Sequence, residues 1–266
     1  MIDEEISLAV NALDEAEKTQ VQTGLLSRKF PEMTMDDAYK VQKMWVQKKI
    51  LTGQKIIGWK IGLTSKAMQY ALNIDTPDSG VLLDDMKFSN KATIPAGRFI
   101  QPRIEAEIAF VMKSSLSGDI TVEDVKNATD YVAASLEILD TRVLRVDPDT
   151  GQSRVIVDTI SDNAANAGVI LGAERHSVDS FDLRRVGAIV SRNNEVEETG
   201  LGAGVLGDPI LGIVWLAKRM AQYGQKIEPG QIILSGSFIR AIEAYPGSHI
   251  CADFGDFGNV SVEFGN

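Results

Sequence analysis

The first apolar residues of the chain recur at the spacing of one face of an α-helix. Aspartate and glutamate residues fill many of the positions between them, so this segment is amphipathic. We therefore predict a helix near the N-terminus that buries one side against the rest of the protein. The predicted buried side consists of Ile6, Ala9, Val10, Leu13 and Ala16.

A second helix is predicted to begin at Thr34, which can cap a helix N-terminus together with Asp37 three residues later. An apolar face at helical spacing follows and ends before Gly53. These two helices predict a helical N-terminal subdomain at residues 1–57. The remaining residues, 58–266, are predicted to form a second domain.

Beyond residue 58, short apolar runs are separated by glycine, proline and asparagine residues, a pattern typical of strands and turns. Asn193 and Asn194 lie between two such runs, and both tolerate the positive φ of a two-residue hairpin turn. Helices are predicted here near residues 121–129 and 210–223, without the regular alternation of a doubly wound fold. We predict an α+β protein with a mixed β-barrel or β-roll core and a helical N-terminal part.

One predicted strand, residues 101–111, carries two negative charges on the same face. Alternate residues of a strand point to opposite faces, so Glu105 and Glu107 lie side by side among apolar neighbours. Such a pair costs free energy unless a cation, an arginine or lysine partner, or a shared proton compensates it. An edge strand whose glutamate face is exposed to water is the alternative interpretation.

A second strand-like run, residues 131–140, also contains one isolated charge, Glu137. Together with Glu105 and Glu107 it provides three carboxylates from two strands. A hard divalent cation such as Mg²⁺ prefers oxygen ligands and keeps positions open for water or substrate. The sequence therefore predicts a metal site at Glu105, Glu107 and Glu137.

Two further residues have both a functional and an ordinary interpretation. Lys60 lies inside a glycine-punctuated strand, residues 58–65, where the backbone can approach a ligand, although a surface lysine is the ordinary interpretation. Asp78 lies in residues 76–80, which have the composition of a turn that this aspartate can close.

The segment of residues 158–168 combines small polar with small apolar residues. This composition suits the wall of a tight pocket. It also suits a helix that begins here and is capped by Ser161 or Asp162, and the two interpretations are compatible.

The composition narrows the class of function. A net charge of −10 and a pI near 4.8 argue against nucleic acid and anionic membranes as partners and favour a small-molecule role. A single cysteine, Cys251, excludes a disulfide framework and a zinc site of the cysteine–histidine type. The N-terminus lacks the pattern of a signal peptide and no apolar run reaches membrane-spanning length, so we expect a cytoplasmic protein.

Six collinear motifs resemble the 2-oxopent-4-enoate hydratase and 4-oxalocrotonate decarboxylase group of the fumarylacetoacetate hydrolase superfamily. The resemblance extends from about residue 30 through the rest of the chain and implies a fumarylacetoacetate-hydrolase-like catalytic domain at residues 58–266. The motifs are GWKIGLTSKAMQ, PDSGVLLDDM, PRIEAEIAFV, LEILDTR, DTISDNAANAG and ILSGSFIR.

The resemblance implies Mg²⁺, or Mn²⁺, held by the same three glutamates. It also implies acid–base roles for Lys60 and Asp78, with Lys60 as a neutral amine near working pH. Ser161 and Asn163 are expected to position water or a substrate carboxylate. The resemblance further implies a homo-oligomer, a pentamer or decamer, that acts in aromatic meta-cleavage catabolism, specifically 4-hydroxyphenylacetate degradation.

The implied reaction is the hydration of a 2-oxo dicarboxylate, 2-oxo-hept-4-ene-1,7-dioate, to 4-hydroxy-2-oxoheptanedioate. Arg240 is expected to bind the second carboxylate, because guanidinium groups match carboxylates bidentately. The alternative is that Arg240 pairs with a surface acid such as Glu243. Competing functions are decarboxylation of an oxalocrotonate-type acid, hydration of 2-oxopent-4-enoate, and a non-enzymatic role as a scaffold subunit.

Overall fold

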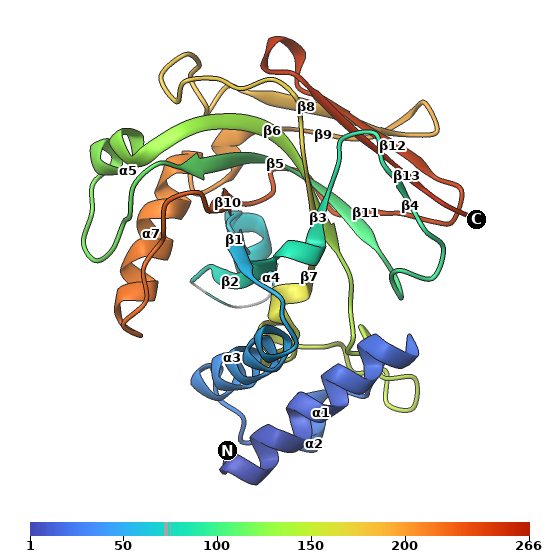
Figure 1. Cartoon of the computed structure of the whole chain (residues 1–266). Coiled ribbons are helices and arrows are strands. Elements are labelled where there is room, and N and C mark those ends of the chain that lie inside the picture. Colours follow the sequence, from blue (N-terminus) through green and yellow to red (C-terminus); the bar gives the residue numbers. More distant parts are fainter. Residues whose placement is uncertain (72–73, 75) are drawn as a thin grey trace.

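A computed structural model of the protein describes residues 1–71, 74 and 76–266. A strongly curled sheet forms the body of the molecule, and the N-terminal helices lie together at one end of it (Figure 1). Within the described residues, none of the helices has the length and apolar character needed to span a bilayer.

All of the described strands follow the N-terminal helices in sequence. The described helices are α1 (Asp3–Thr19), α2 (Leu26–Lys29), α3 (Met35–Leu51), α4 (Lys66–Ala71), α5 (Val122–Ala128), α6 (Ile156–Ser161) and α7 (Pro209–Ala221). The described strands are β1 (Ile56–Gly62), β2 (Asp78–Leu83), β3 (Lys87–Phe88), β4 (Thr93–Ile94), β5 (Arg103–Met112), β6 (Thr129–Leu139), β7 (Asn166–Leu171), β8 (Gly187–Arg192), β9 (Glu195–Leu201), β10 (Ile232–Leu234), β11 (Ile242–Glu243), β12 (His249–Asp253) and β13 (Asn259–Phe264).

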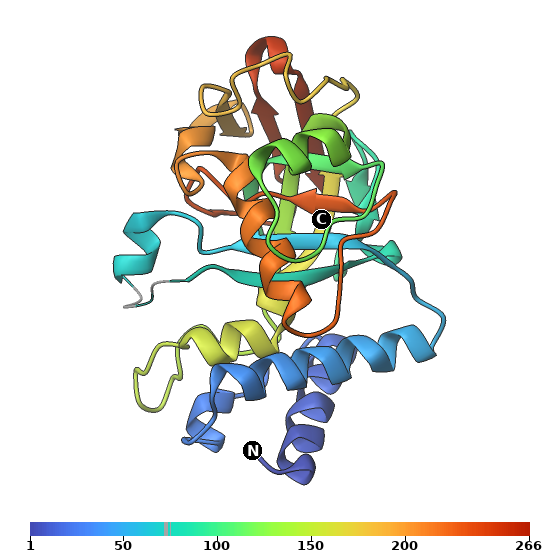
Figure 2. The same ribbon diagram turned by 90° about the vertical axis from the view of Figure 1, so that its left-hand side faces the viewer.

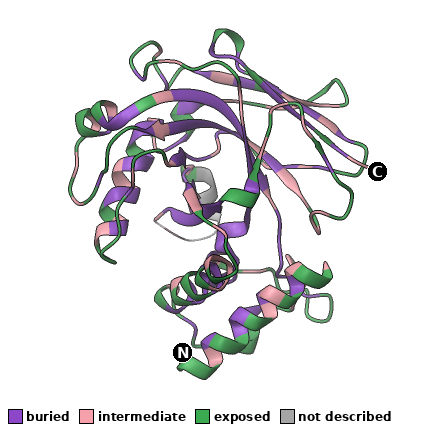
Figure 3. Ribbon diagram, in the orientation of Figure 1, coloured by how far each residue is buried: buried purple, intermediate pink, exposed green. Residues whose placement is uncertain are grey.

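The larger sheet has eight strands among the described residues, in the order β2-β1-β10-β5-β6-β7-β3, with β11 beside β5. The pairs β1–β10 and β3–β7 are parallel, whereas the long central pair β5–β6 is antiparallel. Both central strands are buried over most of their length (Figure 3). This curled, mixed sheet confirms the predicted β-roll core of an α+β protein.

The second sheet has the order β4-β13-β12-β8-β9. Strands β8 and β9 form the predicted hairpin, and Asn193 and Asn194 have φ values of 52° and 69° at its turn. Asparagine adopts this left-handed conformation more readily than most residues, so its place in the sequence determines where the hairpin turns.

Both N-terminal helices are confirmed. The predicted apolar face of α1 is buried, and α3 begins with the predicted capping box of Thr34 and Asp37. The helices pack into an apolar cluster that also takes in Val143 and Ile160, from the segment that follows β6. The helical region therefore shares its core with a distant part of the chain, and the division at residues 57 and 58 stays a prediction.

Two local predictions are wrong. Residues 78–80 do not form a turn but begin strand β2, because Asp78 and Gly80 pair with Gly62 and Lys60 of β1. This pairing satisfies the backbone groups that a turn would have left to water. Likewise, neither Ser161 nor Asp162 caps an α-helix that begins here, because helix α6 ends at Ser161. The short 3₁₀ segment after Asp162, Asn163–Ala165, has left-handed φ values and receives no side-chain cap.

The capping box of α3 gives a stability prediction. The Thr34 hydroxyl accepts a hydrogen bond from the Asp37 amide at 3.2 Å, and Asp37 Oδ2 accepts from the Thr34 amide at 3.1 Å. We expect Thr34→Ala to lower the free energy of unfolding by about 1 kcal/mol, because the helix loses its cap. Urea denaturation measures the change.

Thr52→Ala is the matched control, because the Thr52 hydroxyl donates to a carbonyl at the other end of the same helix and caps no helix start. We expect it to change the unfolding free energy by less than about 0.5 kcal/mol. Equal losses in the two variants would contradict the capping role of Thr34.

Candidate active site

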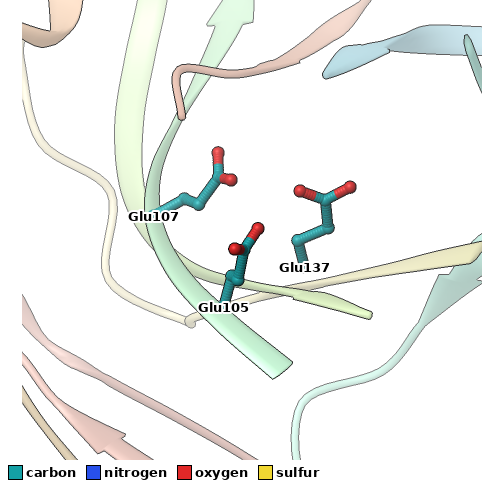
Figure 4. A group of neighbouring side chains, drawn as sticks. All are labelled: Glu105, Glu107 and Glu137. Carbon is teal, nitrogen blue, oxygen red and sulfur yellow. The ribbon is translucent and has the colours of Figure 1, made fainter. Parts of the chain in front are cut away.

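The pairing of β5 with β6 brings the three predicted glutamates together. Glu105 lies directly opposite Glu137, and Glu107 lies opposite Ser135 two residues further along. One carboxylate oxygen from each glutamate lies within 4.8 Å of the others. Figure 4 shows the three carboxylates converging in front of the sheet. The predicted grouping is therefore present in the structure.

These carboxylates are buried with few hydrogen-bond donors around them. Glu107 and Glu137 are fully buried, and Glu105 is partly exposed. Glu107 Oε2 accepts a hydrogen bond from the Gly236 amide at 2.8 Å, whereas Glu107 Oε1 and Glu137 Oε2 have no hydrogen-bond partner among the described residues. Buried oxygens without donors indicate a missing positive partner.

Burial raises the pKa of all three carboxyl groups, and repulsion between the glutamates raises the pKa of Glu105 and Glu107 further. Burial and then the charge of Glu137 raise the pKa of Glu105 to about 8. The pKa of Glu107 is raised by burial and by the charges of Glu137 and Glu105, and that of Glu137 is raised mainly by burial. The group can lower its free energy by holding protons or by binding a cation.

The donor set fits a hard divalent cation. Three carboxylate oxygens from adjacent strands are the ligand type that Mg²⁺, Ca²⁺ and Mn²⁺ prefer, and two of the three side chains have an oxygen without a hydrogen-bond donor among the described residues. The edge-strand alternative is wrong, because β5 is a central strand paired on both sides.

Lys60 lies on β1 and is almost completely buried. Its Nζ lies 3.4 Å from Glu137 Oε1, so it is not a surface lysine. Burial acts to lower its pKa, but the charges of Glu137, Asp78, Glu105 and Glu107 together raise the pKa above the ordinary lysine value. Lys60 is therefore an ammonium beside the metal-free carboxylates, and a neutral amine in the metal-loaded site stays a prediction.

Asp78, the first residue of β2, lies beside β1 and is also buried. Its Oδ1 has no hydrogen-bond partner among the described residues. A Cβ atom on Gly62 would overlap this oxygen, which explains why the paired position is a glycine. Burial raises the pKa of Asp78, against the opposing charges of Lys60 and Arg154.

A pocket of about 700 Å³ opens beside these groups, and Glu105 belongs both to its wall and to the carboxylate group. Charged pairs occupy much of the remaining wall. They are Arg103–Glu243, Arg192–Glu197 and Arg240–Glu198.

The structure places Arg240 at the rim of this pocket. Its side chain is 75% exposed, and its Nε donates to Glu198 Oε1 at 2.7 Å. The alternative of a surface ion pair is thus present, although the partner is not Glu243, which pairs with Arg103. Whether Arg240 also binds substrate stays a prediction.

Ser161 and Asn163 do not lie in the pocket wall. Ser161 Oγ donates to the Val157 carbonyl at 2.7 Å, within helix α6. Asn163 accepts from the Val81 amide at 2.7 Å and donates to the Val81 carbonyl at 2.8 Å. Their polar atoms are thus used to hold α6 and β2, which begins with Asp78.

Asn163 begins a strained turn. Asn163, Ala164 and Ala165 have φ values of 53°, 53° and 59°, three consecutive left-handed residues of which none is glycine. Each such residue costs about 1 kcal/mol or more. The two hydrogen bonds to Val81 help to offset this cost, so the turn and strand β2 depend on each other.

Arg103 and Arg192 belong to the pocket, but sequence reasoning missed them. A signal was present for Arg103, because it precedes Glu105 by two residues and therefore shares its strand face. Arg192 ends β8, and no feature of the local sequence distinguishes it from an ordinary hairpin arginine.

The fold is similar to that of solved hydrolases. The chain superposes on fumarylpyruvate hydrolase from Pseudomonas aeruginosa, solved with Mn²⁺ and pyruvate, with a TM-score of 0.58 over 78% of this chain and 88% of that chain. At 11% identity this likeness concerns the fold alone. The expected fumarylacetoacetate-hydrolase type of fold is therefore confirmed.

Closer relatives define the family. No family model matches the chain. It is 49% identical to 2-oxo-hept-4-ene-1,7-dioate hydratase of Escherichia coli over 259 residues, 97% of each protein. It also superposes on 4-oxalocrotonate decarboxylase from Pseudomonas putida G7, solved with magnesium and adipate, with a TM-score of 0.93 and 33% identity over 99% of this chain and 98% of that chain. The chain belongs to the family that contains these 2-oxo acid hydratases and 4-oxalocrotonate decarboxylases.

The raised pKa values predict how stability depends on pH in the metal-free protein. Between the ordinary glutamate value of 4.5 and about pH 8, folded Glu105 keeps a proton that the unfolded chain has already released. The unfolding free energy therefore falls as pH rises through this range, since the folded state binds more protons. Thermal unfolding with a chelator present measures this trend.

Adding a divalent cation should reverse part of this loss, with a larger gain in melting temperature at pH 8 than at pH 6. Cation binding displaces the protons, so it is weaker where they are held more tightly. Isothermal titration in two buffers of different ionisation enthalpy counts the protons released. A cation-induced gain that is independent of pH, without proton release, would contradict this account of the site.

Proposed function

We propose that the protein is a Mg²⁺-dependent hydratase that converts 2-oxo-hept-4-ene-1,7-dioate and water to 4-hydroxy-2-oxoheptanedioate. The observation that carries this proposal is the buried group of three carboxylates next to Lys60 and Asp78, at a pocket walled by arginines. The 49% identity to the Escherichia coli hydratase supports this substrate over shorter or singly charged ones.

Glu105, Glu107 and Glu137 would hold Mg²⁺, or Mn²⁺ in its place. Their unpartnered oxygens and raised pKa values fit a cation with oxygen ligands. Bound there, the cation would stabilise the negative charge that develops on the 2-oxo oxygen of the substrate.

The reaction places a hydroxyl group on C4 and a hydrogen on C5. A proton leaves C3 and a proton is added at C5, which gives the conjugated 3-enoate; water then adds at C4 while C3 regains a proton. We assign these proton transfers to Lys60 and Asp78. Both are buried, and the raised pKa of Asp78 suits a carboxyl group that accepts and returns a proton near neutral pH.

In our proposal Ser161 and Asn163 do not contact substrate. They help to hold the strand and helix that position the site. Asn163 holds both backbone groups of Val81, three residues after Asp78 on the same strand. Loss of these bonds would shift Asp78, and small displacements of a catalytic group are costly to the rate.

The distal carboxylate of the substrate needs a cationic partner, and two arginines of the pocket, Arg103 and Arg240, could bind it. Arg103 lies two residues from Glu105 on the same strand face, about 7 Å away along the backbone, and is only partly exposed. Six C–C bonds separate the two carboxyl carbons of the dioate. We therefore assign the main contact to Arg103, with the more exposed Arg240 contributing from the rim.

We extend the proposal to the setting of the reaction. The 2-oxo dioate belongs to aromatic meta-cleavage catabolism, and we place the enzyme in 4-hydroxyphenylacetate degradation in the cytoplasm. We also propose a homo-oligomer, a pentamer or decamer, on the basis of the family resemblance. Light scattering of the purified protein measures the number of chains.

The reaction class is tested with the purified protein, Mg²⁺ and the unsaturated dioate. A hydratase gives a product heavier by one water without gas release, and activity of the protein alone excludes a scaffold role. Release of CO₂ in step with substrate loss would instead identify a decarboxylase, the activity named for the structural relative from Pseudomonas putida.

The metal ligands are tested by Glu107→Gln. We expect activity to fall by about 10²-fold or more, because one ligand charge is lost where negative charge must be stabilised. Circular dichroism should show a folded protein, since the side-chain volume is kept. Glu195→Gln, on the exposed β8–β9 hairpin, is the control and should retain activity. Full activity with unchanged Mg²⁺ affinity in the Glu107 variant would exclude the site.

Substrate length is tested by Arg103→Gln and Arg240→Gln. We expect the Arg103 variant to lose about tenfold or more in kcat/KM on the seven-carbon dioate, the scale of one charged hydrogen bond. The Arg240 variant should lose about fivefold or less, because its side chain is 75% exposed whereas that of Arg103 is 34% exposed. The five-carbon mono-acid should respond little to either change. Equal losses on both substrates would make the two arginines structural.

A further inference from the structure

A second cavity lies behind the strands that carry Lys60 and Asp78. It has a volume of about 140 Å³ and is enclosed by α3, α7, β1 and β2. Figure 2 shows α7 running down past β1 and β2 toward α3. The lining of the cavity includes Tyr39, Lys43, Trp59, Ser79, Arg219 and Tyr223.

The cavity shares its wall with the catalytic strands. Neighbouring residues of a strand point to opposite faces, so Trp59 and Ser79 line the cavity while Lys60 and Asp78 face the carboxylates. The Ser79 amide donates to the Tyr39 hydroxyl at 3.2 Å. An occupant of the cavity would therefore contact the backs of the strands that position the proposed proton-transfer groups.

The charge of the cavity is positive in a protein whose net charge is −10. Its charged lining residues are Lys43, at the exposed helix surface, and Arg219. The Arg219 guanidinium lies over two tyrosine rings, 4.2 Å from the Tyr39 centroid and 5.0 Å from the Tyr223 centroid. Its Nη2 is buried and has no hydrogen-bond partner among the described residues.

The Arg219 guanidinium lines the cavity and forms no ion pair or hydrogen bond among the described residues, so its charge is available to an anionic ligand. Carboxylates are the oxygen anions that guanidinium groups bind best in this geometry, and aromatic walls favour a flat apolar body. The size is informative too, because a cavity of about 150 Å³ accommodates benzene in another protein. Charge, donor and volume thus point to the same small class of molecule.

We propose that this cavity is a binding site for a single-ring aromatic carboxylate, whose carboxylate pairs with the Arg219 guanidinium. The site is separate from the catalytic pocket, because the two have no lining residue in common. It is also independent of the reaction assigned to that pocket, since neither its volume nor its charge depends on the metal or the substrate.

The test is a titration of the full-length protein with benzoate, in the presence of Mg²⁺ and saturating oxalate. Oxalate chelates divalent cations and, if the proposed function is right, would occupy the catalytic pocket, so heat that remains would report a second site. We expect saturable binding of one benzoate per chain. Benzyl alcohol, which keeps the ring but lacks the charge, should bind at least about tenfold more weakly, the fold-change of one charged hydrogen bond.

Two arginine variants locate the site. Arg219→Gln should weaken benzoate binding about tenfold or more. Arg175→Gln is the matched control, because Arg175 also lies over a tyrosine ring, 4.5 Å from the Tyr131 centroid, but does not line the cavity. It should bind benzoate as the unchanged protein does.

Three outcomes would overturn the proposal. They are the absence of saturable heat once oxalate is bound, equal affinity for benzoate and benzyl alcohol, and equal affinity of the unchanged protein and a folded Arg219→Gln variant. If Arg219→Gln fails to fold, Arg219→Lys serves instead, because it keeps the charge but changes the donor geometry. We then expect benzoate affinity to fall while benzyl alcohol affinity stays the same, and unchanged benzoate affinity would contradict the site.

Discussion

Carboxylates that are buried side by side repel one another, and the register of β5 on β6 holds three of them in that position. Glu105 faces Glu137 across the strand pair, so the two cannot separate unless the register of the sheet changes. A slip by one residue would turn Ile104, Ile108 and Phe110, which are fully buried on the other face of β5, toward the carboxylates. Apolar packing on one face thus enforces an unfavourable arrangement of charges on the other.

The surroundings of the carboxylates only partly relieve this repulsion. Lys60 contributes one positive charge and Gly236 one amide donor, against three glutamates and Asp78. A hydrophobic residue at any of these positions would suit the metal-free sheet better. The carboxylates therefore lower the free energy of unfolding of the metal-free protein, and a bound cation can restore it. Charges that destabilise the fold in this way indicate a functional site.

The features that sequence predicted correctly are those that depend on near neighbours. Strand alternation alone places Glu105 and Glu107 on one face. The capping box of Thr34 lies within one helical turn, and the two asparagines of the β8–β9 hairpin lie within one hairpin turn. Asp78 shows the limit of this reasoning, because aspartate, serine and glycine favour turns locally and only pairing with β1 makes them a strand. The ion pair of Arg240 shows the same limit. Its partner Glu198 lies 42 residues away, and no local pattern in the sequence distinguishes Glu198 from Glu243 as the partner.

Gln42 links three parts of the chain through one buried side chain. Its amide donates to the Ser79 carbonyl on β2 at 2.9 Å and to the Ile160 carbonyl on α6 at 3.0 Å. Helix α3 therefore braces the strand that begins with Asp78, although its own residues lie outside the catalytic pocket. In evolutionary terms, the N-terminal helices cannot diverge freely or be exchanged between relatives as a separate module. A substitution at position 42 would have to be matched on two other elements for Asp78 to stay in place.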